Sequence, residues 1–209
     1  MMQSTPVDII DYDMGNLRSI ANAMKEVGAD VKLVRRADEL RGGHLILPGV
    51  GAFGASMQNL RAQGMDHAIS GHVASGRPFL GICLGFQVMF EHGTEMGTHT
   101  GLGLFKGTVS RFVTSLHIPH VGWNTIRPAS GESFAHPVMA GTPSGAHVYF
   151  VHSFRAEATE PQDTLTMTEY GGEFVSGVAK DSMAGFQFHP EKSGHTGLRL
   201  LRGFLDWNP

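Results

Sequence analysis

The first ninety residues alternate between short apolar runs and stretches of helical periodicity, and this alternation constrains the fold more than any other feature. Buried strands are predicted from the apolar runs at 7–10, 45–47 and 78–82. Helices are predicted over 16–27, 53–60 and 84–91, where apolar residues recur at helical spacing. Gly28 and Gly64 stand where the first two helices should end. Strand–helix alternation predicts an α/β fold with a mainly parallel sheet flanked by helices.

The second half of the chain has a different pattern. Short strands are predicted at 109–113, 147–154 and 164–170, separated by Gly, Pro, Ser and Thr. These strands are typical of hairpins or of an antiparallel extension of the sheet. A final helix is predicted over 195–207. No repeat and no long linker divides the chain, so we expect a single domain over residues 1–209.

Composition excludes several classes of protein. The formal charge is -3, whereas nucleic acid and anionic membranes select clustered basic surfaces, so neither is an expected partner. A single cysteine excludes an internal disulfide and a cysteine-based zinc site, and no histidine spacing indicates a metal, so we expect no metal and no cofactor. No apolar run approaches the ~20 residues of a membrane span. The N-terminal segment lacks the basic region of a signal peptide, which favours a cytoplasmic protein.

The segment 49–54 matches the pattern G-x-G-x-x-G and precedes a predicted helix. This pattern can indicate dinucleotide binding. Here it follows Pro48 rather than the first strand, and the acidic residue expected ~20 positions further on is absent. Two other interpretations remain: a tight turn with closely packed backbone, or a turn whose N–H groups face a substrate.

Cys83 lies in the segment Gly81-Ile82-Cys83-Leu84-Gly85, which has the form of a sharp strand-to-helix elbow around a nucleophile. The flanking glycines let such a turn close without Cβ clashes. The start of the next helix favours the thiolate, and the Leu84 N–H is expected to donate to an oxyanion. The alternative is that Cys83 is a small buried apolar residue.

A nucleophilic cysteine needs a base and a group that orients the base. Of the twelve histidines, His189 differs because it ends an apolar strand and is followed by Pro190 and Glu191. Residues i and i+2 of an extended segment project to the same side, so Glu191 is expected to reach the imidazole and hold its tautomer. The alternative is a solvated surface pair.

Together these segments resemble the class I glutamine amidotransferases, a family with a Cys-His-Glu triad on a flavodoxin-like α/β fold. The resemblance covers nearly the whole chain. It implies Cys83, His189 and Glu191 as catalytic residues. It also implies an oxyanion site formed by Leu84, Gly49, Val50 and Gly51. Substrate contacts are implied for Gln87, His152, Ser153 and Phe154.

Within the family, five stretches resemble the glutaminase subunits of imidazole glycerol phosphate synthases: residues 14–19, 47–54, 101–105, 120–124 and 149–154. That resemblance implies glutamine as substrate and a heterodimer with a (β/α)₈-barrel cyclase, to which the ammonia passes during histidine biosynthesis. Residues implied to face the partner or the ammonia route are Asn16, Trp123, Asn124, Tyr149 and Lys192. The alternatives are a glutaminase for anthranilate, pyridoxal phosphate or guanylate synthesis, and a catalytically silent or nucleotide-binding module on the same fold.

Overall fold

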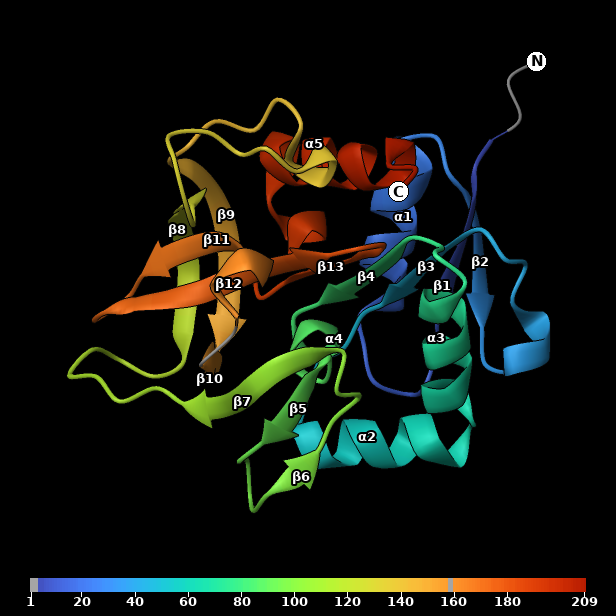
Figure 1. Cartoon of the computed structure of the whole chain (residues 1–209), viewed down its shortest axis with the longest axis horizontal. Coiled ribbons are helices and arrows are strands. Elements are labelled where there is room, and N and C mark those ends of the chain that lie inside the picture. The colour runs from blue at the N-terminus through green and yellow to red at the C-terminus, as the bar shows by residue number, and fades with distance from the viewer. Residues whose placement is uncertain (1–3, 158–159) are drawn as a thin grey trace.

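The computed structural model describes residues 4–157 and 160–209, so the first three residues of the N-terminal segment lie outside it (Figure 1). Its strands are β1 (Pro6–Ile10), β2 (Asp30–Val34), β3 (His44–Leu47), β4 (Phe79–Ile82), β5 (Phe90–Gly93), β6 (His99–Thr100), β7 (Phe105–Arg111), β8 (His120–Pro128), β9 (Ala146–His152), β10 (Phe154–Glu157), β11 (Thr164–Glu169), β12 (Glu173–Lys180) and β13 (Met183–Phe186). Its α-helices are α1 (Leu17–Glu26), α2 (Phe53–Ala62), α3 (Met65–Ala74), α4 (Leu84–Gln87) and α5 (Gly194–Asp206).

Five parallel strands form one half of the sheet, in the order β2-β1-β3-β4-β13. This is the flavodoxin-like order 2-1-3-4-5, with β13 in the fifth place. The predicted flavodoxin-like α/β fold with a mainly parallel core is therefore confirmed. The carboxyl ends of β3, β4 and β13 lie beside one another, and open α/β sheets bind ligands at that edge.

Helices cover both faces of the parallel half (Figure 1). On one face, α1 and α5 bury Met24 and Phe204 in one core cluster. On the other, α2 and α3 bury Met57 and Ile69 in a second cluster. Because both faces are covered, the central strand β4 is apolar and all four of its residues are buried.

The rest of the sheet is mostly antiparallel and extends from β12 to β6. Strand β12 pairs with β13, β10 and β11, and β10 continues to β7. Strands β8 and β9 form a long pair that joins the sheet through β11. The predicted antiparallel extension is therefore confirmed.

The predicted helix over 84–91 is wrong beyond Gln87. The backbone at Val88 and Met89 instead accepts hydrogen bonds from Leu102 and Leu104, both at 2.8 Å, and β5 begins at Phe90. These long-range pairings replace the helical bonds that local spacing predicted.

Strand boundaries in the second half also differ from the prediction. The strand expected at 147–154 is two strands, because β9 pairs with β8 whereas β10 pairs with β7, and Ser153 lies between them. The strand expected at 109–113 begins earlier, at Phe105, and ends at Arg111. The predictions missed β2, β5, β6, β8, β12 and α3.

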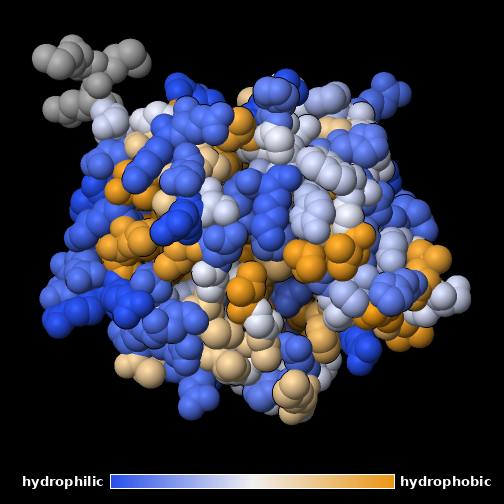
Figure 2. Space-filling view, turned by 180° about the vertical axis from the view of Figure 1, so that it is seen from behind, coloured by the Kyte–Doolittle hydropathy of each residue, from blue (hydrophilic) through white to orange (hydrophobic). Residues whose placement is uncertain are grey.

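None of the described helices is long and apolar enough to cross a membrane. On the face shown in Figure 2, hydrophobic residues gather in patches among hydrophilic ones. The large hydrophobic side chains that remain exposed include Val50, Val121 and Trp123.

Candidate active site

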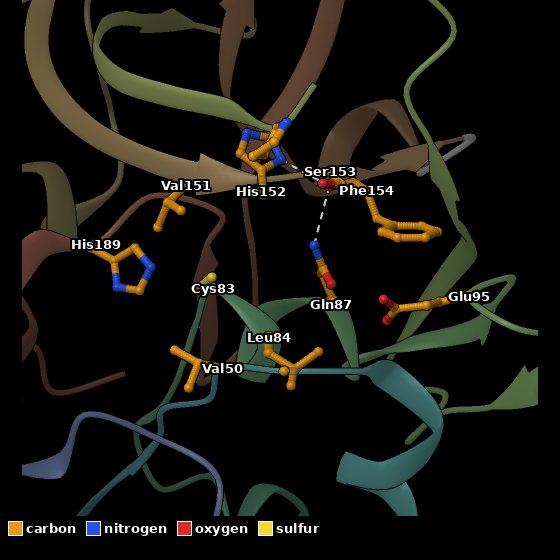
Figure 3. A pocket seen from close by; sticks show the side chains of 12 residues that line it. Val50, Cys83, Leu84, Gln87, Glu95, Val151, His152, Ser153, Phe154 and His189 are labelled. Atoms are coloured by element: carbon orange, nitrogen blue, oxygen red, sulfur yellow. Dashed lines mark hydrogen bonds between the residues drawn. The ribbon is translucent and has the colours of Figure 1, made fainter. Parts of the chain in front are cut away.

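Cys83 lies directly between β4 and α4, in the predicted elbow. Its φ of 55° and ψ of -108° are strained for a residue with a side chain. The Cys83 N–H donates to the Phe186 carbonyl of β13 at 2.8 Å, which holds the turn. A Cβ at Gly85 would collide with the Leu47 carbonyl oxygen, so only glycine fits there. The elbow therefore forms by close backbone packing, and the Cys83 sulfur faces a cavity (Figure 3).

His189 and Glu191 are in contact, with His189 Nδ1 2.8 Å from Glu191 Oε1. Their side chains are 3% and 4% exposed. The extended geometry predicted for Glu191 is wrong, because Pro190–Lys192 forms a 3₁₀ turn. This turn carries the carboxylate back to the imidazole. The backbone N–H of His189 donates to the Tyr149 carbonyl at 2.9 Å, which anchors the segment to β9.

The charge state of His189 depends on its neighbours. Burial alone would lower its pKa, but the negative charges of the Cys83 thiolate and the Glu191 carboxylate outweigh burial and raise the pKa to about 10. Nε2 of His189 has no hydrogen-bond partner among the described residues. A protonated imidazole with a free N–H at the cavity can donate a proton to a leaving group.

The cavity has a volume of about 350 Å³. It brings together the sulfur, the imidazole and all four residues predicted to contact substrate. Its lining residues are Val50, Gly51, Cys83, Leu84, Gln87, Glu95, Pro119, Val151, His152, Ser153, Phe154 and His189. In Figure 3, His189 lies on one side of Cys83, and Gln87 and Glu95 lie on the other.

Sequence reasoning missed Glu95, Pro119 and Val151 in this lining. Glu95 belongs to the loop between β5 and β6, and one of its carboxylate oxygens accepts the Phe53 N–H at 2.9 Å. Its carboxylate points toward Gln87 (Figure 3). Nothing in the local sequence distinguishes Glu95 from a solvated acidic residue, because only the folded hairpin brings it to the cavity.

The turn after β3 contains Gly49, Val50 and Gly51, and all three lie beside the elbow. The Leu84 N–H donates to the Gly49 carbonyl at 3.3 Å. The donor predicted for the oxyanion is therefore engaged with the turn in this structure. Gly51 has a φ of 110°, which glycine adopts readily, and the Val50 side chain is 44% exposed. A glycine on each side of Val50 makes rotation of the intervening peptides inexpensive.

Three of the residues implied to face a partner gather at one surface. Trp123 is 57% exposed and packs edge-on against Tyr149, with ring centroids 6.1 Å apart. The Lys192 ammonium lies 5.8 Å from the Tyr149 ring centroid. These contacts leave the Trp123 ring available to a docked partner.

The other two lie apart from this group. Asn16 is exposed at the start of α1 and binds the Ser19 hydroxyl at 2.8 Å. It also borders a small void shared with Val50 and Glu191. Asn124 does not present its amide to the surface group, because the amide contacts His120 and the Glu169 carbonyl.

No metal site is visible in the described part of the chain: no three His, Cys, Asp or Glu side chains come together as ligands. The segment 49–54 covers the turn after β3 and the first two residues of α2. Its backbone packs closely, since a Cβ at Gly49 would collide with the Tyr12 hydroxyl.

The fold, the elbow at Cys83 and the buried pair of His189 and Glu191 together define a class of protein. Residues 8–206 match the glutamine amidotransferase class-I family, and the chain belongs to it. A solved structure of PurLQS from Thermotoga maritima has the same fold, with a TM-score of 0.78 and 19% identity over 98% of this chain and 99% of that one.

Two curated relatives place the chain in one group within this family. The imidazole glycerol phosphate synthase subunit HisH of Symbiobacterium thermophilum is 43% identical over 92% of this chain and 90% of its own length. The HisH subunit of Sulfurimonas denitrificans is 44% identical over 96% of this chain and 98% of its own length. The chain therefore belongs to the HisH glutaminase subunits of imidazole glycerol phosphate synthase, which are glutamine amidotransferases.

Proposed function

We propose that this chain hydrolyses glutamine through a triad of Cys83, His189 and Glu191. The observation that carries the proposal is the strained elbow that aims Cys83 into the same cavity as His189, whose other ring nitrogen contacts Glu191 at 2.8 Å. A buried carboxylate in this position fixes the imidazole tautomer and stabilises its charged form. We further propose that residues 1–209 act as one domain, since one sheet runs through both halves.

The reaction proceeds in two steps. The Cys83 thiolate attacks the carboxamide carbon, and His189 gives its proton to the nitrogen, so that the C–N bond breaks and ammonia leaves. The product is a glutamyl thioester. Neutral His189 then takes a proton from water, the hydroxide attacks the thioester, and the C–S bond breaks to release glutamate.

Charge places the substrate in the cavity. Apart from the triad residues, Glu95 is the acidic residue of the cavity lining, so its carboxylate is suited to bind the α-ammonium of glutamine. Gln87 lies at the same end of the cavity (Figure 3). The backbone of the segment from His152 to Phe154 forms the opposite wall and contacts the amino-acid end of the substrate. The carboxamide then extends toward Cys83.

The oxyanion site is proposed to be gated. With the Leu84 N–H bound to the Gly49 carbonyl, one donor is withheld from the substrate. Rotation of the peptides at Val50 and Gly51 would turn their N–H groups toward the cavity and release Leu84. Losing one such donor typically lowers the rate by ~10²–10³. Activity should therefore be weak until something moves the exposed Val50.

A partner supplies that trigger and receives the ammonia. We propose a cyclase of the (β/α)₈-barrel type, forming a heterodimer with this chain in the cytoplasm and making imidazole glycerol phosphate and aminoimidazole carboxamide ribotide. Docking would cover the exposed Val50 and Asn16, which border the void beside Glu191, together with the exposed Trp123. A covered route matters because ammonia released into water is protonated and ceases to be a nucleophile.

Two assays test this function. Glutaminase activity should be weak for the chain alone and rise by ~10² or more with the cyclase subunit and its nucleotide bound. Cys83→Ala should abolish glutamine-dependent synthesis in the complex, whereas synthesis from added ammonium salt should persist. Glutamine-dependent synthesis by the Cys83→Ala complex would exclude Cys83 as the nucleophile.

A further inference from the structure

Two histidines outside the triad form a buried pair, of which His152 lines the cavity and His120 lies behind it. His120 begins β8 and His152 ends β9, and the two residues are direct cross-strand partners. His120 Nδ1 lies 3.0 Å from His152 Nε2. The residues are only 3% and 5% exposed. Burying a polar group costs free energy unless the group is hydrogen-bonded. The ring of His120 has no role in the proposed reaction steps, so its burial calls for another explanation.

The neighbours of the pair fix the direction of each hydrogen bond. A carbonyl oxygen can only accept, so the Phe154 carbonyl, 2.8 Å from His152 Nδ1, requires a proton on that nitrogen. His152 Nε2 is then the acceptor, and His120 donates to it through Nδ1. His120 Nε2 in turn accepts from the Asn124 amide at 3.3 Å.

Both rings are neutral in this arrangement. Burial lowers the pKa of His120 to about 4 and that of His152 to about 3. The ring of His120 is also held in place by stacking between Phe150 and Tyr170, with centroids 4.7 Å and 3.9 Å away. The donor on His120 therefore has one orientation.

The chain of hydrogen bonds continues into the cavity. The Phe154 carbonyl that accepts from His152 also accepts from the Gln87 amide nitrogen at 3.1 Å (Figure 3). The second hydrogen of that nitrogen goes to Gln187 Oε1 at 2.9 Å. With both hydrogens used, the Gln87 amide cannot flip, and its oxygen is left to accept from a ligand.

We propose that His120 is a positioning residue for glutamine binding, which acts through His152 and the Phe154 carbonyl to hold the Gln87 amide with its oxygen toward the substrate's α-ammonium. This inference rests on the proposed function, in which Gln87 contacts glutamine. In this role His120 does not contact the substrate, and the effect of His120 on glutamine binding requires Gln87.

A thermodynamic cycle tests this dependence in the complex with the cyclase. His120→Phe keeps a ring between Phe150 and Tyr170 but removes the donor, and should raise KM for glutamine about 10-fold with little change in kcat. In a Gln87→Ala background the same substitution should change KM less than 2-fold. Tyr170→Phe is the matched control, since it removes a hydrogen bond to His117 from the same aromatic layer, and it should leave KM unchanged.

The outcomes separate the two proposals. If the unaltered complex lacks glutaminase activity, the proposed function fails. If that complex is active but His120→Phe leaves KM unchanged, or raises it equally in both backgrounds, the positioning role is overturned.

A second measurement needs no variant. Side-chain nitrogen NMR of the intact chain at pH 7 should show both rings neutral with the proton on Nδ1. A proton on Nε2 of either ring, or a charged ring, would also overturn the inference.

Discussion

The parallel and antiparallel halves of the sheet differ in what they contribute to the site. The parallel half supplies the bond-making groups: Cys83 follows β4, and His189 follows β13. The antiparallel half supplies the recognition wall, with Glu95 after β5 and Phe154 at the start of β10. The comparison indicates that the reacting groups follow strands of the parallel half, whereas the extension supplies most of the recognition wall, to which Gln87 on α4 adds from the parallel half.

The interiors of the two halves differ as well. The central strands β3 and β4 of the parallel half are buried among apolar residues. The extension buries clusters of hydrogen-bonded polar groups in its interior. Ser176 is fully buried and contacts the hydroxyls of Thr166 and Thr168 at 2.9 and 2.8 Å. Polar interiors of this kind specify a single arrangement. The same half also buries His120 and His152, and because an imidazole can titrate, this part of the interior responds to pH.

The largest effect on activity should come from a substitution in the proposed triad. His189→Ala removes the proton donor for ammonia and should lower kcat by ~10⁴ or more, with KM nearly unchanged. Steady-state glutaminase kinetics of the complex would measure this. His195→Ala, on the exposed start of α5, is the control and should behave like the parent chain. An equal loss in both variants would contradict the triad assignment.

The next effect is on stability. Gly85→Ala would drive a Cβ into the Leu47 carbonyl and should lower the free energy of unfolding by more than about 3 kcal/mol. Gly71→Ala in α3 meets nothing within 4 Å and should be neutral or raise it by up to about 1 kcal/mol. Chemical denaturation distinguishes the two. A tolerated Gly85→Ala would show that the elbow is looser than described.

The antiparallel half should be the more acid-sensitive one. Burial lowers the pKa of His152 to about 3, so below pH 6.5 the unfolded chain binds a proton that the folded chain refuses. Stability from this group is complete above pH 6.5 and is lost as pH falls toward 3, by roughly 2 kcal/mol at pH 5.

Denaturation of the parent chain and of His152→Leu at pH 7 and pH 5 checks this sign. The variant should be less stable at pH 7 but lose less on acidification. An identical loss in both proteins would show that the buried histidine pair does not cause the acid sensitivity.

The smallest of these effects concerns recognition. Glu95→Gln keeps an acceptor for the Phe53 N–H but removes the charge opposite the α-ammonium, and should raise KM for glutamine about 10-fold at nearly constant kcat. Glu91→Gln, on β5 and outside the cavity lining, is the control. A fall in kcat with unchanged KM for Glu95→Gln would break the division between chemistry and recognition.

The same division explains what the sequence could predict. In the parallel half, β1, α1, β3, α2 and β4 are each encoded within a few residues, and the elbow is a contiguous motif, so their order and the placement of Cys83 followed from local pattern. The partly exposed edge strand β2 and the helix α3 lacked a clear local pattern and were missed. His189 and Glu191 are also contiguous. For this pair, the geometry of Glu191 was predicted wrongly, because Pro190 begins a 3₁₀ turn rather than continuing the strand.

The antiparallel half could not be predicted in the same way. The backbone at Val88 and Met89 leaves the helix because residues 102–104 pair with it, and such pairing is invisible in a local window. Glu95 has no motif around it. The significance of His120 depends on a cross-strand partner 32 positions away. Recognition groups of this kind emerge only from the folded sheet.

The central claim, that Cys83 attacks glutamine in this cavity, has one direct test. The complex with the cyclase can be incubated with 6-diazo-5-oxo-L-norleucine, a glutamine analogue that alkylates an attacking nucleophile, and then mapped by peptide mass spectrometry. The account predicts one adduct, on Cys83, whose formation glutamine suppresses and His189→Ala slows. An adduct on another residue, or an unmodified Cys83 in a complex that turns over glutamine, would contradict it.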